Sequence, residues 1–289
     1  MSQPTLLDPQ QFLDRKSFVE LNARERAQAL LDEGTYRELL GPFERLESPW
    51  LVLQRVVPQA DDGLIVARGR IGGIDSVILA IEGQFQGGGI GEVSGAKIAA
   101  ALDLALEDAK RGRPIRVVLL FETGGVRLQE ANLGLEAIAE INSSLIALRQ
   151  HLPVVGVIAG MIGCFGGMSI AASLCSYLIM TRQARLGLNG PEVIEEQSGI
   201  EEFDSKDRQL IWAVNGGEQR HVTDFADYLA EDDVEAIKEC IVDAFGRGIP
   251  TTHRSEQVDD YLKRLAAIDV SRQLESSEIR KAWSQGENL

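Results

Sequence analysis

The chain has 289 residues, of which 44% are hydrophobic and 25% are charged, and its formal net charge at pH 7 is −15. This composition is that of a soluble globular protein. The negative charge, without any Lys/Arg cluster, argues against nucleic-acid binding, and no apolar run approaches the ~20 residues that a membrane span needs.

The N-terminal part predicts a helical region followed by strands. Residues 9–48 carry leucines spaced among many charges, as in an amphipathic helix, and Pro49 closes this region. Apolar stretches at residues 51–53, 64–67 and 77–81 are separated by turn signals, and they predict a meander of strands. A glycine-rich segment at residues 83–91 then leads into a helix predicted from about Val93 to Lys110.

Two successive units then share the order of strand, glycine pair and helix. In the first, the apolar residues 117–121 precede Gly124-Gly125, and a helix is predicted over about 129–151, before Pro153. In the second, residues 154–159 precede Gly166-Gly167 and a helix over 168–176. Such units place backbone N–H groups at two helix N-termini, where they can hold a developing negative charge. The pair of units therefore predicts an oxyanion hole.

The rest of the chain predicts short strands and then helices. Residues 177–181 and 184–188 have the pattern of strands, and the chain from residue 191 onward is polar and helical. Repeated βαβ-type units without a low-complexity linker predict a single α/β domain over residues 1–289. We expect a helical extension over about 1–49, a core over about 50–230 and a second helical extension over about 231–289.

The cysteines and the N-terminus bear on the cellular compartment. The three cysteines are Cys164, Cys175 and Cys240, and no CxxC spacing occurs. This pattern indicates neither a disulfide framework nor a zinc ribbon, and no metal-ligand spacing of His with Asp or Glu is visible. No charged region followed by an apolar one marks a signal peptide. We therefore expect a reduced cytoplasmic protein without a metal.

Five segments, in order along residues 23–230, resemble the β-type subunits of biotin-dependent carboxyltransferases, a family with the crotonase-like (ClpP/crotonase) fold. They are ARER with LLDEGTY (23–26 and 30–36), GGGIGEVSGAK (87–97), GGVRLQE (124–130), GGMS (166–169) and GPEVIE (190–195). The resemblance implies an α/β fold of repeated ββα units with extra helices at both termini. Two departures from the family motifs narrow the choice of subfamily. The four-cysteine ribbon of the bacterial acetyl-CoA carboxylase β subunit is missing, and Glu192 stands where an arginine usually follows Gly-Pro.

Within this family the chain is most similar to the β subunits of biotin-independent malonate decarboxylases. The resemblance implies decarboxylation of a malonyl thioester, through an enolate, to the acetyl thioester and CO2. The thioester would be carried on the phosphoribosyl-dephospho-CoA arm of an acyl carrier protein, with no cofactor bound directly by this chain. A homologous γ subunit would complete the active site in a heterodimer or a higher oligomer. Two alternatives stay open: a carboxyltransferase β subunit of a biotin-dependent acyl-CoA carboxylase, and a non-catalytic subunit that docks a carrier.

The resemblance also implies where the enolate is held. The amides at Gly125–Val126 and at Gly166–Gly167 would donate to its oxygen. His221 lies beside a glycine-rich turn and is a candidate acid for protonating the carbanion. A residue of the partner subunit or a water molecule is the alternative donor, and His221 is then a surface histidine.

Other residues of the same motifs are candidates for binding the thioester arm. Gly124 and Arg127 of the first motif are two of them. Arg127 either meets phosphates of the arm or steadies its turn, and it could do so paired with Glu130 or Glu122 at a helix start. Gly88 and Gly89 either line the channel for the pantetheine part of the arm or simply connect a strand to a helix.

Overall fold

The computed structural model describes residues 15–269 and 274–285, so residues 1–14, 270–273 and 286–289 of the predicted terminal extensions lie outside the described residues. At its centre is a seven-stranded sheet whose strands pair in the order in which they occur along the chain. The strands are β1 (Arg37–Leu39), β2 (Leu64–Ile71), β3 (Ile74–Ile81), β4 (Arg116–Phe121), β5 (Val154–Ile158), β6 (Tyr177–Thr181) and β7 (Tyr228–Ala230). The β1–β2 and β2–β3 pairs are antiparallel, and the pairs from β3 to β7 are parallel. The predicted α/β fold is confirmed, with a mixed sheet.

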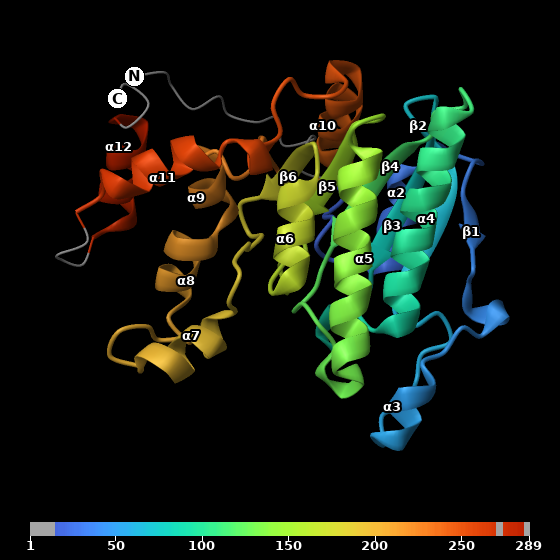
Figure 1. The fold of residues 1–289 in the computed structure, drawn as a ribbon, viewed down its shortest axis with the longest axis horizontal. Helices are drawn as coiled ribbons and strands as arrows, with labels where there is room; N and C mark the ends of the chain where they lie inside the picture. The colour runs from blue at the N-terminus through green and yellow to red at the C-terminus, as the bar shows by residue number, and fades with distance from the viewer. Residues whose placement is uncertain (1–14, 270–273, 286–289) are drawn as a thin grey trace.

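Helices cover both faces of this sheet. On one face lie α4 (Glu92–Lys110), α5 (Asn132–Leu148) and α6 (Gly167–Leu174), and on the other lie α2 (Ala23–Leu30) and α10 (Val234–Arg247) (Figure 1). The side chains of β4 alternate between two cores, because Val117 and Leu119 join one apolar cluster, whereas Val118 and Leu120 join the other. A strand buried on both faces reads as a continuous apolar run, which is why the sequence revealed it.

The parallel order fixes where the turns after the strands lie. The helices α4, α5 and α6 each return the chain to the start of the next strand, so the carboxyl ends of β3, β4 and β5 meet at one edge of the sheet. The strand–glycine–helix units predicted from the sequence are confirmed as β4 with α5 and as β5 with α6. Both glycine pairs therefore lie at the same edge.

The helix predicted over residues 9–48 is confirmed only in α2, since residues 15–22 are not helical and the prediction is also wrong between residues 31 and 53. The helix α2 ends at Leu30, and after Gly34, whose φ is +71°, the chain forms β1 and a 3-10 turn, η1 (Pro42–Glu44). Residues 51–53, predicted as a strand, lie in the helix α3 (Pro49–Leu53). Pro49 occupies its first turn and the Ser48 side chain accepts a hydrogen bond from the Trp50 N–H, and such start signals outweigh a short apolar run.

The chain after β6 is mainly helical. It forms α7 (Pro191–Ser198), α8 (Arg208–Asn215), α9 (Gly217–Val222), α10, the 3-10 turn η4 (Arg254–Glu256), α11 (Val258–Ala266) and α12 (Ser276–Gln285). The three-residue strand β7, which the sequence pattern missed, lies between α9 and α10. Asp232 accepts hydrogen bonds from the N–H groups of Phe18 and Val19 at 2.9 Å, so it joins the start of the described chain to its C-terminal part. Among the described residues, no helix has both the length and the apolar character to cross a membrane.

The turns beyond the strand ends pair with one another. Isolated bridges join Ile90 to Val126, Thr123 to Cys164, and Cys164 to Leu186. The strand predicted at residues 184–188 is thereby reduced to the bridge residues 185 and 186. This ladder of bridges places the two glycine turns, at residues 123–127 and 163–168, side by side.

Candidate active site

The two glycine turns touch at Gly125 and Gly166. Gly125 has a φ of +111°, and Gly166 has a φ of +60° with a ψ of −147°. Side chains other than hydrogen are strained in these conformations. A Cβ atom on Gly125 would lie 3.1 Å from the Cα atom of Gly166, and one on Gly166 would lie 3.1 Å from the Cα atom of Gly125. The close approach of the turns therefore requires glycine on both sides.

In the first turn, one of three successive amides is free. The Gly124 N–H donates to the carbonyl of Gly87 at 2.9 Å, and the Gly125 N–H donates to Oγ1 of Thr123 at 3.0 Å. The next amide, on Val126, has no acceptor in the part of the chain that the structure describes. The prediction named Gly125 and Val126 together, and the contacts leave only Val126 able to donate to a ligand.

In the second turn, the prediction named Gly166 and Gly167, and of these two only Gly167 has a free amide. The Gly166 N–H donates to the carbonyl of Leu188 at 2.8 Å. Gly167 begins α6, so its N–H has no partner within the helix, and no other described residue accepts from it. The nitrogen of Val126 lies 3.9 Å from the position of a Cβ on Gly166. One free donor on each turn thus flanks the contact between the turns, at the positive end of the α6 dipole.

Arg127 faces the interior of the protein. Its buried guanidinium lies 2.8 Å from the carboxylates of Asp62 and Glu130, and its Nε donates to the carbonyl of Gly89 at 3.1 Å. The same two carboxylates accept N–H groups at the start of α4. Burial raises the pKa of Asp62 above its ordinary value, and the Arg127 charge opposes this rise. This cation is already buried and paired, so it does not contact phosphates of the thioester arm. Of the two predicted roles of Arg127, the contacts fit the one in which it steadies the first turn.

The segment with Gly88 and Gly89 packs behind the first turn. Gly88 has a φ of +66°, and a Cβ atom on it would lie 1.9 Å from the carbonyl oxygen of Glu122. A Cβ atom on Gly89 would lie 3.2 Å from the Cα atom of Arg127. These contacts fit the role of a connection between strand and helix that supports the turn, and the role in a pantetheine channel stays a prediction.

His221 and Cys164 differ in where they lie relative to the glycine turns. Nδ1 of His221, in α9, lies 3.1 Å from the carbonyl of Ala226, in the loop before β7, so the ring is bonded to that loop and to neither glycine turn. Its role as an acid stays a prediction. Cys164 lies in the second turn and is fully buried, and burial raises the pKa of its thiol well above the ordinary value. It is a packing residue.

Sequence reasoning missed the side chains beneath the first turn. Thr123 is buried and bonds the Gly125 amide, which an i to i+2 pattern of threonine before glycine can indicate. Glu122 forms a buried ion pair with Arg26 of α2. A Cβ atom on Gly160 would lie 2.1 Å from the Glu122 carboxyl carbon, so this glycine leaves room for the carboxylate. The pairing of Glu122 with a residue 96 positions away has no local signal in the sequence.

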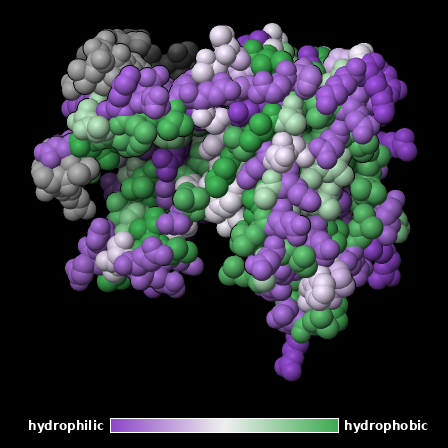
Figure 2. Space-filling model, in the orientation of Figure 1, coloured by the Kyte–Doolittle hydropathy of each residue, from purple (hydrophilic) through white to green (hydrophobic). Residues whose placement is uncertain are grey.

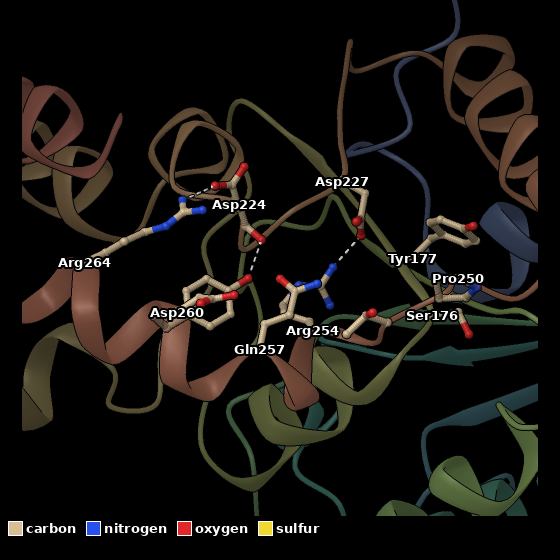
Figure 3. Close-up of a pocket in the computed structure, with 11 residues that line it drawn as sticks. Ser176, Tyr177, Asp224, Asp227, Pro250, Arg254, Gln257, Asp260 and Arg264 are labelled. Atoms are coloured by element: carbon tan, nitrogen blue, oxygen red, sulfur yellow. Dashed lines mark hydrogen bonds and ion pairs between the residues drawn. The ribbon is translucent and has the colours of Figure 1, made fainter. Parts of the chain in front are cut away.

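A polar pocket lies at the other end of the sheet (Figure 3). It is lined by Tyr177, which begins β6, and by residues of the C-terminal helices. Ion pairs join Arg254 to Asp227 and Arg264 to Asp224 across it. These pairs attach η4 and α11 to the core. The glycine turns follow the carboxyl ends of their strands, so this pocket is a separate feature.

Comparison with known proteins supplies the family context. Residues 19–264 match the family model described as carboxyl transferase domain. The chain is 37% identical over 289 residues to malonyl-S-ACP:biotin-protein carboxyltransferase MADC of Malonomonas rubra, which covers 96% of this chain and 91% of that protein. It is also similar to a chain in the crystal structure of a Pseudomonas malonate decarboxylase hetero-tetramer in complex with malonate, with a TM-score of 0.92 and 55% identity over 95% of this chain and 100% of that one. A transcarboxylase 12S structure, 23% identical with a TM-score of 0.65 over 78% of this chain and 40% of that one, shares the fold alone.

Proposed function

The chain belongs to the carboxyl transferase domain family, and on this premise we propose that it is the β subunit of a malonate decarboxylase, which converts a malonyl thioester to the acetyl thioester and CO2. One observation carries the proposal. The backbone N–H groups of Val126 and Gly167, one on each glycine turn, have no acceptor among the described residues, and the two flank one contact.

The chemistry needs donors at this place. When CO2 leaves, the electrons of the broken C–C bond move to the α-carbon and onto the thioester carbonyl oxygen, which gives an enolate. The α-carbon then takes a proton and becomes the methyl group of the acetyl thioester. Backbone donors held in advance lower the barrier, and removal of one such donor typically costs ~3–4 kcal/mol. Val126 and Gly167 supply these donors.

The relatives agree on the malonyl group and differ on its fate. The Pseudomonas structure is a malonate decarboxylase with malonate bound, whereas the name of the Malonomonas protein specifies transfer to a biotin protein. We assign the biotin-independent reaction, because identity to the Pseudomonas chain is 55% and to the Malonomonas protein 37%. Transfer of the carboxyl group to a biotin protein is the second candidate, and the name of the 37% identical relative favours it.

A partner subunit covers the glycine turns in this proposal. The Pseudomonas relatives form a hetero-dimer and a hetero-tetramer. Large apolar side chains near the turns of this chain are exposed, with Leu128 at 80%, Met161 at 72% and Leu188 at 61%. Figure 2 shows a notch between the part that carries α7 and α8 and the main body, with apolar surface on both sides. We assign this surface to a homologous γ subunit, because exposed apolar patches mark interaction sites.

The thioester reaches the turns on an acyl carrier protein in this scheme. Its phosphoribosyl-dephospho-CoA arm supplies the thioester, so this chain binds no cofactor directly. His221 remains the candidate acid on this chain, and the γ subunit or a water molecule is the alternative. The substitution His221→Gln separates them, since only the first assignment predicts a loss of turnover.

The proposal extends to architecture and location. We assign the units that end in the turns after β3, β4 and β5 to a crotonase-like repeat of ββα units, with additional helices at both ends. They belong to one carboxyl transferase domain over residues 1–289 of a cytoplasmic protein.

The experiment uses the chain co-purified with its γ subunit and carrier protein, and measures CO2 release from the malonyl-loaded carrier with and without avidin. We expect release that avidin does not inhibit. Loss of the carboxyl group only when a biotin protein is added, and its inhibition by avidin, would select the biotin-protein reaction. A stable complex that removes no carboxyl group with or without the biotin protein would contradict both.

The role of the amide is tested by Gly167→Pro against Gly167→Ala. Proline is well tolerated at the first position of a helix and removes the N–H, whereas alanine keeps it. Both add a Cβ atom 2.9 Å from Cγ2 of Ile138, so this contact is common to the two variants, and proline alone adds Cγ and Cδ. Turnover is therefore referred to the folded fraction of each variant. We expect turnover of the proline variant to be ~100-fold below that of the alanine variant. Equal turnover of the two would contradict the oxyanion role of this amide.

A further inference from the structure

Thr123 is the residue on which the first glycine turn is built. Its backbone N–H donates to the carbonyl of Gly163 at 2.8 Å, and its carbonyl accepts from the N–H of Phe165 at 3.0 Å. Its side chain is fully buried. Thr123 is therefore fixed to the second turn through its backbone, and its hydroxyl group has a fixed position relative to both turns.

This hydroxyl group sets the orientation of the peptide between Gly124 and Gly125. Oγ1 accepts the Gly125 N–H at 3.0 Å. Glycine at a φ of +111° has many other conformations within easy reach, including those in which this peptide is rotated. The hydrogen bond selects one of them. Without it, a buried N–H would have no partner, which is a strong reason for the turn to rearrange.

The following peptide is oriented by a backbone group. The Gly125 carbonyl accepts the N–H of Ile90 at 2.9 Å. In a trans peptide the C=O and N–H bonds point in opposite directions, so this bond turns the Val126 N–H away from Ile90. Two hydrogen bonds therefore set the direction of the free Val126 N–H, and only the one accepted by Thr123 involves a side chain.

We infer that Thr123 is a positioning residue for the oxyanion site: its hydroxyl holds the Gly125 amide so that, of the amides in the first turn, only that of Val126 is presented to the enolate oxygen. The kinetic part of this inference rests on the proposed function, whereas the part that concerns the turn does not.

The test compares Thr123→Val with Thr123→Ser in the co-purified complex. Valine keeps the branched shape and loses the acceptor, and serine keeps the acceptor. We expect Thr123→Val to lower kcat roughly 10- to 100-fold with KM within about 3-fold of the parent, because small displacements of catalytic groups have effects of this size. Serine should restore kcat to within about 3-fold. All rates are referred to the folded fraction, measured by thermal unfolding.

A second measurement needs no activity. Amide hydrogen exchange, followed by NMR with selective glycine and valine labels, should show a protected Gly125 N–H and a rapidly exchanging Val126 N–H in the parent and in Thr123→Ser. In Thr123→Val the Gly125 N–H should lose its protection.

The outcomes distinguish a failure of the proposed function from a failure of the role inferred for Thr123. If the parent complex releases no CO2, the proposed function fails and the exchange data alone decide the role of Thr123. Unchanged protection of Gly125 in Thr123→Val overturns the inference. Lost protection with unchanged kcat in an active complex also overturns it, because the oriented amide then contributes nothing to turnover.

Discussion

Side chains add to the backbone hydrogen bonds that hold the first glycine turn, whereas the second turn is held mainly by backbone groups. The hydroxyl of Thr123 and the buried guanidinium of Arg127 fix the first turn. In the second, the Gly166 N–H bonds to the backbone carbonyl of Leu188 and the chain enters α6 at once. The free amide of Val126 therefore depends on side chains as well as on glycine conformation, whereas the free amide of Gly167 depends mainly on backbone conformation. Substitution of the supporting side chains should damage the first turn more than the second.

The largest expected effect follows from removal of the Arg127 charge, which lies beneath the first turn. Arg127→Met leaves the carboxylates of Asp62 and Glu130 buried without their partner, which should lower the free energy of unfolding by about 3–5 kcal/mol. The matched change at the second turn is Arg185→Met. Its guanidinium donates to neutral carbonyls, so we expect a loss of about 1–2 kcal/mol. Urea unfolding followed by circular dichroism measures both.

A second substitution sharpens this result. Adding Glu130→Gln to Arg127→Met removes one of the unpaired charges and should recover part of the lost stability. Equal losses for the two arginine variants, or no recovery, would show that the first turn does not depend on its charges.

The next effect concerns glycine conformation in the second turn. Gly166→Ala places a side chain at a φ of +60° with a ψ of −147° and should cost ~1–3 kcal/mol of stability. Gly124→Ala is the matched control in the first turn, because the nearest atom to its added Cβ, the carbonyl oxygen of Gly87, is at 3.4 Å. It should change the free energy of unfolding by less than about 0.5 kcal/mol. A larger loss from Gly124→Ala than from Gly166→Ala would contradict the comparison.

The smallest effect is a pH dependence at Glu38 in β1, outside the two turns. A hydrogen bond from Arg24, which also pairs with Asp61, holds the pKa of Glu38 below its ordinary value of 4.5. The stabilisation by this carboxylate is therefore present above pH 4.5 and is lost as the pH falls through the lower value of the folded protein. Glu38→Gln should cost about 1 kcal/mol at pH 7, because the pair is partly exposed.

The control is Gly166→Ala in the second turn, with its effect on the free energy of unfolding measured over the same range of pH. The cost of Glu38→Gln should shrink as urea unfolding is repeated at falling pH, whereas the cost of Gly166→Ala should stay constant because it involves no titrating group. A cost of Glu38→Gln that does not change with pH would refute the assignment.

The sheet and its helices were predictable where local signals agreed. β4 and β5 are continuous apolar runs because both of their faces are buried, and the glycine pairs mark the turns that follow them. The helix α3 was missed because its three apolar residues outweighed the start signals of Ser48 and Pro49 in the prediction. β7 was missed because a three-residue strand has too little sequence to show a period.

The site was predictable only to the level of the glycine pairs. Which amide is free depends on acceptors supplied by other segments, such as the carbonyl of Leu188, 22 positions beyond Gly166 (188 minus 166). Every residue has a backbone carbonyl, so acceptors of this kind cannot be recognised from the sequence. Arg127 was ambiguous for a related reason, since its partner Glu130 is local but Asp62 is 65 positions away.

The order of the strands bears on how the protein is made. Each strand pairs with the one before it, so a chain leaving the ribosome finds the edge for its next strand already formed. The links from Phe18 and Val19 to Asp232 are of another kind, since the first of them spans 214 positions. The N-terminal segment can form these two bonds only after most of the chain has been synthesised.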